Sequence, residues 1–133
     1  MSEPSYHPHE IVILVVDDEV VVRNLVQRVL AREGYQVLTA ANGEEALELV
    51  RTFPDAVHLL LTDVNMPTLD GFKLAKLVRL EKPKIKIMFM SGRWEVPGET
   101  FPSNVIMKPF QIRDLVEKVR SVLDERPGEP DAI

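Results

Sequence analysis

The most informative part of the sequence is residues 57–71, VHLLLTDVNMPTLDG. Its first six residues form an almost wholly apolar run, which is followed directly by the carboxylate of Asp63. A run of this kind, followed by a turn that contains Pro67 and Gly71, is typical of a buried strand that leads into a loop. We therefore expect a strand over 57–62 that places Asp63 at its carboxyl end.

Two other apolar runs end in the same way. Residues 11–16, IVILVV, precede Asp17 and Asp18, and residues 104–107 precede Lys108 and Pro109. Further strands are predicted at 35–40 and 85–90, and helices at 19–33, 43–52, 70–81 and 111–125. Strands that alternate with helices predict an α/β fold, doubly wound, with helices on both faces of a parallel sheet. The apolar strands 11–16 and 57–62 suit a sheet that is covered on both sides.

The fourth connection, residues 92–103, departs from this pattern. It contains Gly92, Pro97, Gly98 and Pro102. A crossover between parallel strands takes a dozen or more residues and usually carries a helix. The helix expected here is shortened to one or two turns around 93–96, or missing.

The sequence predicts one domain, residues 11–125, between two irregular ends. Residues 1–10 are expected to form a flexible leader, in which His7 and His9 are solvated rather than bound to a metal. Residues 126–133, RPGEPDAI, are expected to be a disordered tail. His58 lies within a predicted strand and is interpreted as a hydrogen-bonded core or sheet-end residue rather than as a ligand.

Composition excludes several classes of function. The chain has 133 residues, 45% of them hydrophobic, and a formal net charge of -5, which argues against direct binding of nucleic acid. Its one basic stretch is interpreted as a helix end and a solvated loop; it comprises Arg79, Lys82, Lys84 and Lys86. The chain has no cysteine, which excludes disulfides and thiolate nucleophiles and is compatible with the cytoplasm. No apolar stretch is long enough to span a membrane.

Polar side chains follow the predicted strands at one edge of the sheet, where open parallel sheets bind their ligands. They are Asp17, Asp18, Asp63, Ser91 and Lys108. Clustered carboxylates repel one another unless a cation lies between them, and Mg²⁺ prefers oxygen ligands. We expect Asp18 and Asp63 to bind Mg²⁺ directly, Asp17 to bind it directly or through water, and the backbone carbonyl of Asn65 to complete the site.

This arrangement suits phosphoryl chemistry. A carboxylate such as that of Asp63 can attack a phosphoryl group, and the transfer depends mainly on positioning and charge neutralisation. Mg²⁺ and Lys108 would neutralise the phosphoryl oxygens, and the hydroxyl of Ser91 would donate a hydrogen bond to one of them. A purely structural acid cluster would leave Ser91 and Lys108 at this edge unexplained.

These motifs together resemble the receiver domain of two-component response regulators over residues 11–125. The resemblance is carried by Asp17-Asp18, Asp63 with Met66-Pro67 and Asp70-Gly71, Ser91-Gly92, and Lys108-Pro109-Phe110. It implies a flavodoxin-like (βα)5 sheet of order 2-1-3-4-5, phosphorylation of Asp63 by the phosphohistidine of a partner, and Mg²⁺ held at Asp17 and Asp18. It further implies that Ser91 is a switch hydroxyl and that Lys108 contacts the phosphoryl group. The Lys108–Pro109 bond is expected to be cis, in a tight turn.

Three hypotheses for function follow from these motifs. The first is a phosphorylatable receiver, stand-alone or part of a phosphorelay, which serves a sensor histidine kinase or phosphotransfer protein and a downstream protein that the sequence does not identify. The second is a pseudo-receiver that binds proteins regardless of phosphorylation. It is supported by Val105, which replaces an aromatic residue frequent in the family, and by the short fourth crossover. The third is a Mg²⁺-dependent phosphatase-like enzyme, for which 133 residues leave little room. In the first case, we expect activation to alter the surroundings of Trp94.

Overall fold

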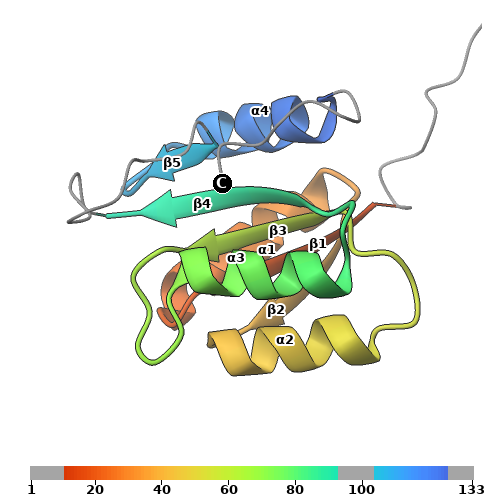
Figure 1. Ribbon diagram of the computed structural model, residues 1–133. Helices are drawn as coiled ribbons and strands as arrows, with labels where there is room; N and C mark the ends of the chain where they lie inside the picture. The colour runs from red at the N-terminus through yellow and green to blue at the C-terminus, as the bar shows by residue number, and fades with distance from the viewer. Residues whose placement is uncertain (1–10, 93–103, 126–133) are drawn as a thin grey trace, which may run out of the picture.

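A computed structural model describes residues 11–92 and 104–125 of the chain as a sheet of five parallel strands with four helices (Figure 1). The strand order is β2-β1-β3-β4-β5. The strands are β1 (Val12–Val16), β2 (Gln36–Ala40), β3 (Leu59–Asp63), β4 (Lys86–Ser91) and β5 (Val105–Met107). The helices are α1 (Val20–Arg32), α2 (Gly43–Thr52), α3 (Gly71–Glu81) and α4 (Ile112–Leu123).

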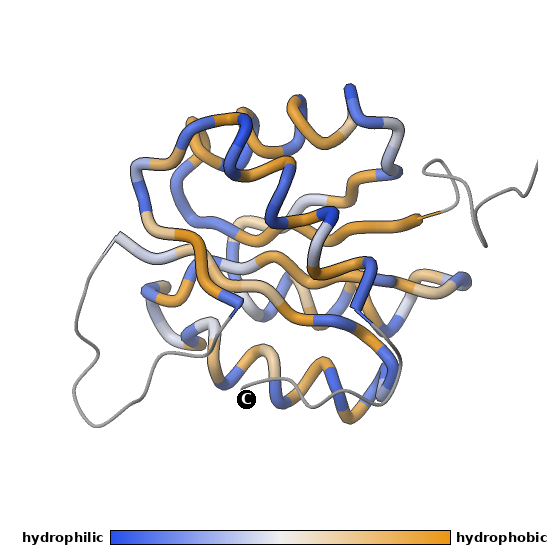
Figure 2. Tube along the Cα trace, turned by 90° about the horizontal axis from the view of Figure 1, so that it is seen from above, coloured by the Kyte–Doolittle hydropathy of each residue, from blue (hydrophilic) through white to orange (hydrophobic). Residues whose placement is uncertain are grey.

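The sheet separates two hydrophobic layers, and alternate residues of a strand face opposite layers. In β1, Ile13 and Val15 pack with apolar residues of α1 and α4, whereas Leu14 and Val16 pack with those of α2 and α3. Figure 2 shows the apolar strands between helices that turn polar residues outward. All residues of β1 and β3 are buried, as predicted for strands covered on both faces.

Local sequence signals explain where the helices begin. The side chain of Asn42 accepts a hydrogen bond from the backbone N–H of Glu45 at 2.8 Å and caps α2. Asp70 caps α3 in the same way through the N–H of Lys73, at 2.9 Å. By contrast, the N-cap residue of α1, Glu19, makes no such bond with its side chain. That side chain is therefore available for another contact, which is described below.

The fold class and the strand order predicted from the sequence are confirmed, with element boundaries that differ by one or two residues. β3 begins at Leu59 rather than at 57 and includes Asp63, and β4 extends to Ser91. His58 lies just before β3, where its Nδ1 accepts a hydrogen bond from the N–H of Val12 at 3.0 Å. It therefore has the sheet-end role expected of it, and burial lowers the pKa of His58.

Some predictions fall outside the described residues. They are the flexible leader 1–10 with His7 and His9, the tail 126–133, and the shortened fourth crossover over 93–103 with Trp94. The same limit applies to the domain boundaries. In the part of the chain that the structure does describe, no helix has the length and apolar character needed to cross a membrane.

Candidate functional site

The carboxyl ends of three strands bring the predicted acids and the predicted lysine together. Asp17 and Asp18 follow β1, Asp63 ends the neighbouring β3, and Lys108 follows β5. The register pairs Val16 with Thr62, so that Asp17 lies beside Asp63 at the same edge. One carboxylate oxygen from each of Asp17, Asp18 and Asp63 lies within 4.8 Å of the other two. The three acids, predicted from two separate parts of the sequence, thus form one acidic cluster.

The cluster opens into a cavity of about 270 Å³ at this edge of the sheet. Asp17 is fully buried and Asp63 is 4% exposed, whereas Asp18 lies on the surface. The residues that line the cavity are Asp18, Glu19, Asp63, Asn65, Gly92 and Lys108. Asp63 is therefore a buried carboxylate that still faces an open cavity, through which a reactant can reach it.

Lys108 connects the carboxylates. Its Nζ lies 2.8 Å from Oδ2 of Asp17, 3.3 Å from Oε1 of Glu19 and 3.5 Å from Oδ1 of Asp63. The backbone N–H of Lys108 donates to the carbonyl of Ser91 at 2.7 Å, and this bond fixes the start of the turn after β5. The Lys108–Pro109 peptide bond is cis.

The electrostatic environment shifts the pKa of both central groups. Burial raises the pKa of Asp63 to about 6; the charge of Lys108 opposes this rise, and those of Asp17 and Asp18 add to it. Burial disfavours the charged form of Lys108, but its hydrogen bond to Asp17 and the charges of Asp63, Asp17 and Glu19 outweigh that effect and raise its pKa. At neutral pH, Asp63 is thus mainly a carboxylate, the form that can act as a nucleophile.

Asp17 is held in place by hydrogen bonds from Glu19, Lys108 and Arg23. Its Oδ1 accepts a hydrogen bond from the N–H of Glu19 at 2.9 Å, and its Oδ2 accepts one from Lys108. Nη1 of Arg23 donates to the carbonyl of Asp17 at 2.7 Å. Because both carboxylate oxygens of Asp17 already accept hydrogen bonds, Asp18 is the acid whose oxygens are more available to a cation.

Two contributions were missed in the sequence analysis. Glu19 adds a third carboxylate to the surroundings of Lys108, besides Asp17 and Asp63, and Arg23 anchors the backbone of Asp17. The only available signals were the position of Glu19 directly after two acids and that of Arg23 one helical turn later. Neither position by itself identifies a partner, because the contacts depend on how α1 leaves the sheet.

Gly71 holds the loop after Asp63 close to the strand. A Cβ on residue 71 would lie 2.3 Å from the backbone oxygen of Asp63, and the N–H of Gly71 donates to the carbonyl of Val64 at 2.9 Å. Glycine therefore permits a backbone approach that a side chain would prevent. With Asp70 as the cap of α3, this contact fixes the start of the helix against the site.

Ser91 and Val105 occupy β4 and β5. Ser91 is fully buried as the last residue of β4, beside β3, where Asp63 pairs with Met90. Ser91 lies at the same edge of the sheet as Asp63, as predicted, although it is not one of the described residues that line the cavity. Val105 pairs with Phe89 and packs, half-buried, against the layer of α2 and α3.

Comparison with known proteins agrees with this geometry. Residues 13–120 match the family described as the response regulator receiver domain. The chain is 36% identical over 116 residues to the response regulator receiver protein CpdR of Brucella abortus, and this match covers 84% of the chain and 95% of that protein. It is also similar to the solved receiver domain of the hybrid histidine kinase CckA, with 37% identity, a TM-score of 0.73 and coverage of 85% of this chain and 99% of that one.

Other relatives are longer. The alkaline phosphatase synthesis transcriptional regulatory protein PhoP of Bacillus subtilis is 37% identical over 116 residues, which cover 84% of this chain but 48% of that protein. The chain thus spans about half the length of many curated relatives it matches. The similarity covers the sheet, its helices and the acidic cluster alike. The chain therefore belongs to the response regulator receiver domain family, whose members accept phosphoryl groups in two-component signalling.

Proposed function

We propose that Asp63 accepts a phosphoryl group from the phosphohistidine of a partner protein. The observation that carries this proposal is the position of Asp63, a buried carboxylate that faces an open cavity 3.5 Å from Nζ of Lys108. Asp17 and Asp18 add negative charge beside Asp63, and Nζ of Lys108 adds positive charge 3.5 Å from it. This combination of charges suits a phosphoryl group that is bound by both a cation and an ammonium.

The donor set fits Mg²⁺. Mg²⁺ prefers oxygen ligands and is usually held by one or two carboxylates together with phosphate oxygens. Three carboxylate oxygens, one each from Asp17, Asp18 and Asp63, lie within 4.8 Å of one another and would offer such a donor set. In the proposed site, Asp18 and Asp63 would bind Mg²⁺ directly, Asp17 would bind it directly or through water, and the backbone carbonyl of Asn65 would contribute a further oxygen. When bound, Mg²⁺ supplies charge neutralisation at the phosphoryl oxygens.

The chemical step is a displacement at phosphorus. An oxygen of Asp63 forms the new P–O bond while the P–N bond of the phosphohistidine breaks, and the electron pair of that bond returns to the imidazole nitrogen. Lys108 then shifts from Asp63 toward a phosphoryl oxygen, a movement that its long side chain allows. The hydroxyl of Ser91 is proposed to move toward another phosphoryl oxygen and to donate a hydrogen bond to it. This movement of Ser91 is the proposed switch.

The donor is proposed to be a sensor histidine kinase or a phosphotransfer protein, encountered in the cytoplasm. Apolar side chains are exposed on the first turns of α1, which begins two residues after Asp18. Val20, Val21 and Leu25 are 53%, 76% and 41% exposed. Ile112 at the start of α4 is 55% exposed at the same edge of the sheet. Exposed apolar groups beside a reactive carboxylate suit docking of a partner that brings its histidine to the cavity.

Mass spectrometry of the intact protein tests the proposal. Incubation with acetyl phosphate and Mg²⁺ should add one phosphoryl group to the parent chain and none to Asp63→Asn. The control is Asp55→Asn, the same change at an exposed acid on the connection between α2 and β3, which should accept phosphate like the parent. Label on Asp63→Asn would contradict the assignment. An unlabelled parent chain would favour the pseudo-receiver, a binding module that does not depend on phosphate.

A further inference from the structure

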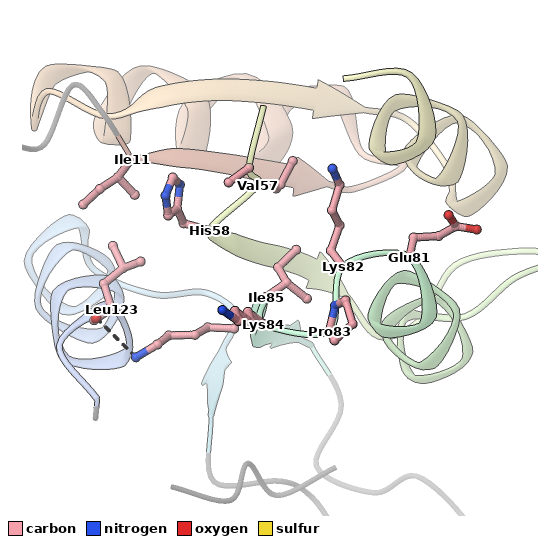
Figure 3. A pocket seen from close by; sticks show the side chains of 11 residues that line it. Ile11, Val57, His58, Glu81, Lys82, Pro83, Lys84, Ile85 and Leu123 are labelled. Atoms are coloured by element: carbon pink, nitrogen blue, oxygen red, sulfur yellow. Dashed lines mark hydrogen bonds between the residues drawn. The ribbon is translucent and has the colours of Figure 1, made fainter. Parts of the chain in front are cut away.

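A larger cavity, of about 540 Å³, lies at the opposite edge of the sheet, where the strands begin (Figure 3). Four segments form it: the start of β1, the connection before β3, the connection between α3 and β4, and the end of α4. Its volume lies within the range of about 300–1,000 Å³ that is common for sites of small molecules. None of the residues that line it belongs to the acidic cluster.

The inner surface of this cavity is apolar. Ile11, Val57, Ile85 and Leu123, each less than one tenth exposed, contribute to its lining. Figure 3 shows Ile11 and Leu123 with His58 on one side of the cavity, and Glu81 and Lys82 on the other. An apolar part of a ligand would be removed from water here, which is favourable in proportion to the area buried.

His58 offers the cavity a hydrogen-bond donor. Its Nδ1 accepts a hydrogen bond from Val12 and therefore carries no proton, so that the neutral ring is protonated at Nε2. Burial lowers the pKa of His58 and favours this neutral form. None of the hydrogen bonds found among the described residues uses Nε2. The ring can thus donate one hydrogen bond to a ligand.

The rim is basic, although the chain as a whole has a net charge of -5. Lys82, Lys84 and Lys86 all line the cavity. Nζ of Lys86 donates to carbonyls at the end of α4, those of Val122, Leu123 and Glu125. Nζ of Lys82 lies 3.4 Å from the carbonyl of Asp55, and Lys84 is exposed on the rim.

Among the described residues that line the cavity, Glu81 is the single acid, and it is already paired. Oε1 of Glu81 accepts a hydrogen bond from Nε of Arg51 at 3.1 Å. The side chains that remain for a ligand are therefore donors, namely the ring of His58 and the exposed ammonium of Lys84. A ligand that complements them must bring acceptor oxygens and negative charge, together with an apolar body that fits the inner surface.

We propose that this cavity binds an organic carboxylate with an apolar body, such as a medium-chain fatty acid or an aryl acid. The apolar body lies on Ile11, Val57, Ile85 and Leu123. The carboxylate accepts hydrogen bonds from Nε2 of His58 and from the ammonium of Lys84. The site lies at the far end of the strands from Asp63, so that its occupant does not compete with phosphate or Mg²⁺.

The test is an NMR titration of the full chain, labelled at isoleucine, leucine and valine methyl groups, with sodium octanoate as the probe. The proposal expects saturable shifts confined to the methyl groups that line the cavity, those of Ile11, Val57, Ile85 and Leu123. 1-Octanol and octylammonium, which have similar apolar bodies but lack the carboxylate, should bind roughly tenfold more weakly, as expected for loss of a charged hydrogen bond. Equal shifts with octanol, or shifts that do not saturate, would overturn the proposal.

A charge reversal locates the carboxylate. Lys84→Glu should weaken octanoate binding by roughly tenfold and leave octanol binding unchanged. Lys84→Arg keeps the positive charge and should retain octanoate binding. Lys76→Glu makes the same change on the exposed side of α3 and should have no effect. The proposal fails if Lys84→Glu and Lys76→Glu behave alike. It also fails if methyl groups of the cavity show contacts with residues 1–10 or 126–133 that octanoate does not displace, because the chain itself would then fill the cavity.

Discussion

Gly71 lies against the backbone of Asp63 so closely that a Cβ on residue 71 would come within 2.3 Å of the carbonyl oxygen of Asp63. The two residues are separated by a loop of seven residues, 64–70, that returns the chain to the end of β3. The start of α3 is thereby fixed to the strand that carries the proposed phosphorylation site. The neighbouring backbone atoms cannot move away without a shift of Asp63 itself.

Gly71→Ala should therefore destabilise the protein and misplace Asp63. We expect a loss of about 1–3 kcal/mol in the free energy of unfolding, typical of overpacking, and slower phosphorylation by acetyl phosphate. Urea denaturation and intact-mass measurements check the two effects. The matched control is Gly92→Ala, because a Cβ on residue 92 would meet no atom within 4 Å. If both variants are equally stable, the backbone of Asp63 does not prevent a side chain at residue 71.

Asp63→Asn should stabilise the metal-free protein at neutral pH. The pKa of Asp63 is raised from 3.8 to about 6, so that the folded state binds a proton more tightly than the unfolded state. The free energy of unfolding of the parent therefore falls as the pH rises from about 3.8 to about 6. The variant lacks this penalty and should be more stable above pH 6 by on the order of 2 kcal/mol.

The gain from Asp63→Asn should shrink below the ordinary pKa of 3.8, where the parent carboxyl is protonated in both states. Urea denaturation in the presence of a chelator, across this pH range, measures it. Mg²⁺ should reduce the gain because it binds the folded parent. A gain that is the same at every pH would show that the cause is not the charge of Asp63.

Asp18 should matter more than Asp17 for the binding of Mg²⁺ without phosphate. Asp18 is exposed and lines the cavity, whereas both oxygens of Asp17 accept hydrogen bonds from Glu19 and Lys108. We expect Asp18→Ala to lower the affinity for Mg²⁺ by roughly tenfold or more, and Asp17→Asn to lower it less. Isothermal titration calorimetry measures both affinities. In metal-free buffer, Asp18→Ala should also be at least as stable as the parent, because one repulsive charge is removed. Equal losses of affinity would rule out this division of roles.

Thr68→Gly should stabilise the loop after Asp63. Thr68 has a φ of 69°, which is rare for a residue branched at Cβ, and the N–H of Leu69 donates to the carbonyl of Pro67 at 2.7 Å across it. Glycine adopts this backbone conformation without the steric cost. After the larger entropy of glycine in the unfolded chain is subtracted, we expect a net gain of about 0.5–1 kcal/mol in unfolding free energy. Thr68→Ala, which keeps a Cβ, should gain less; a larger gain for alanine would contradict the assignment to backbone strain.

The sequence alone was sufficient to predict the alternation of strands and helices and the acids at the strand ends. These features depend on residues that are close together in the chain: an apolar run such as 57–62, a turn at Pro67 and Gly71, and a carboxylate between them. Because the carboxyl ends of parallel strands share one edge of a sheet, local patterns also predicted that Asp17, Asp63 and Lys108 would meet. The presence of Lys108 within 3.5 Å of Asp63 agrees with that expectation.

Only the tertiary structure decided the contacts between segments that are distant in sequence. The carboxylate of Glu19 forms an ion pair with Lys108, and Nδ1 of His58 accepts a hydrogen bond from the N–H of Val12. Residue 71 must be glycine because the backbone of Asp63 lies against it. The cavity at the other edge of the sheet likewise combines four segments between Ile11 and Leu123, none of which has a distinctive motif. Such contacts depend on the angles at which helices and loops leave the sheet, and these angles are set by packing across the whole core rather than by any local pattern.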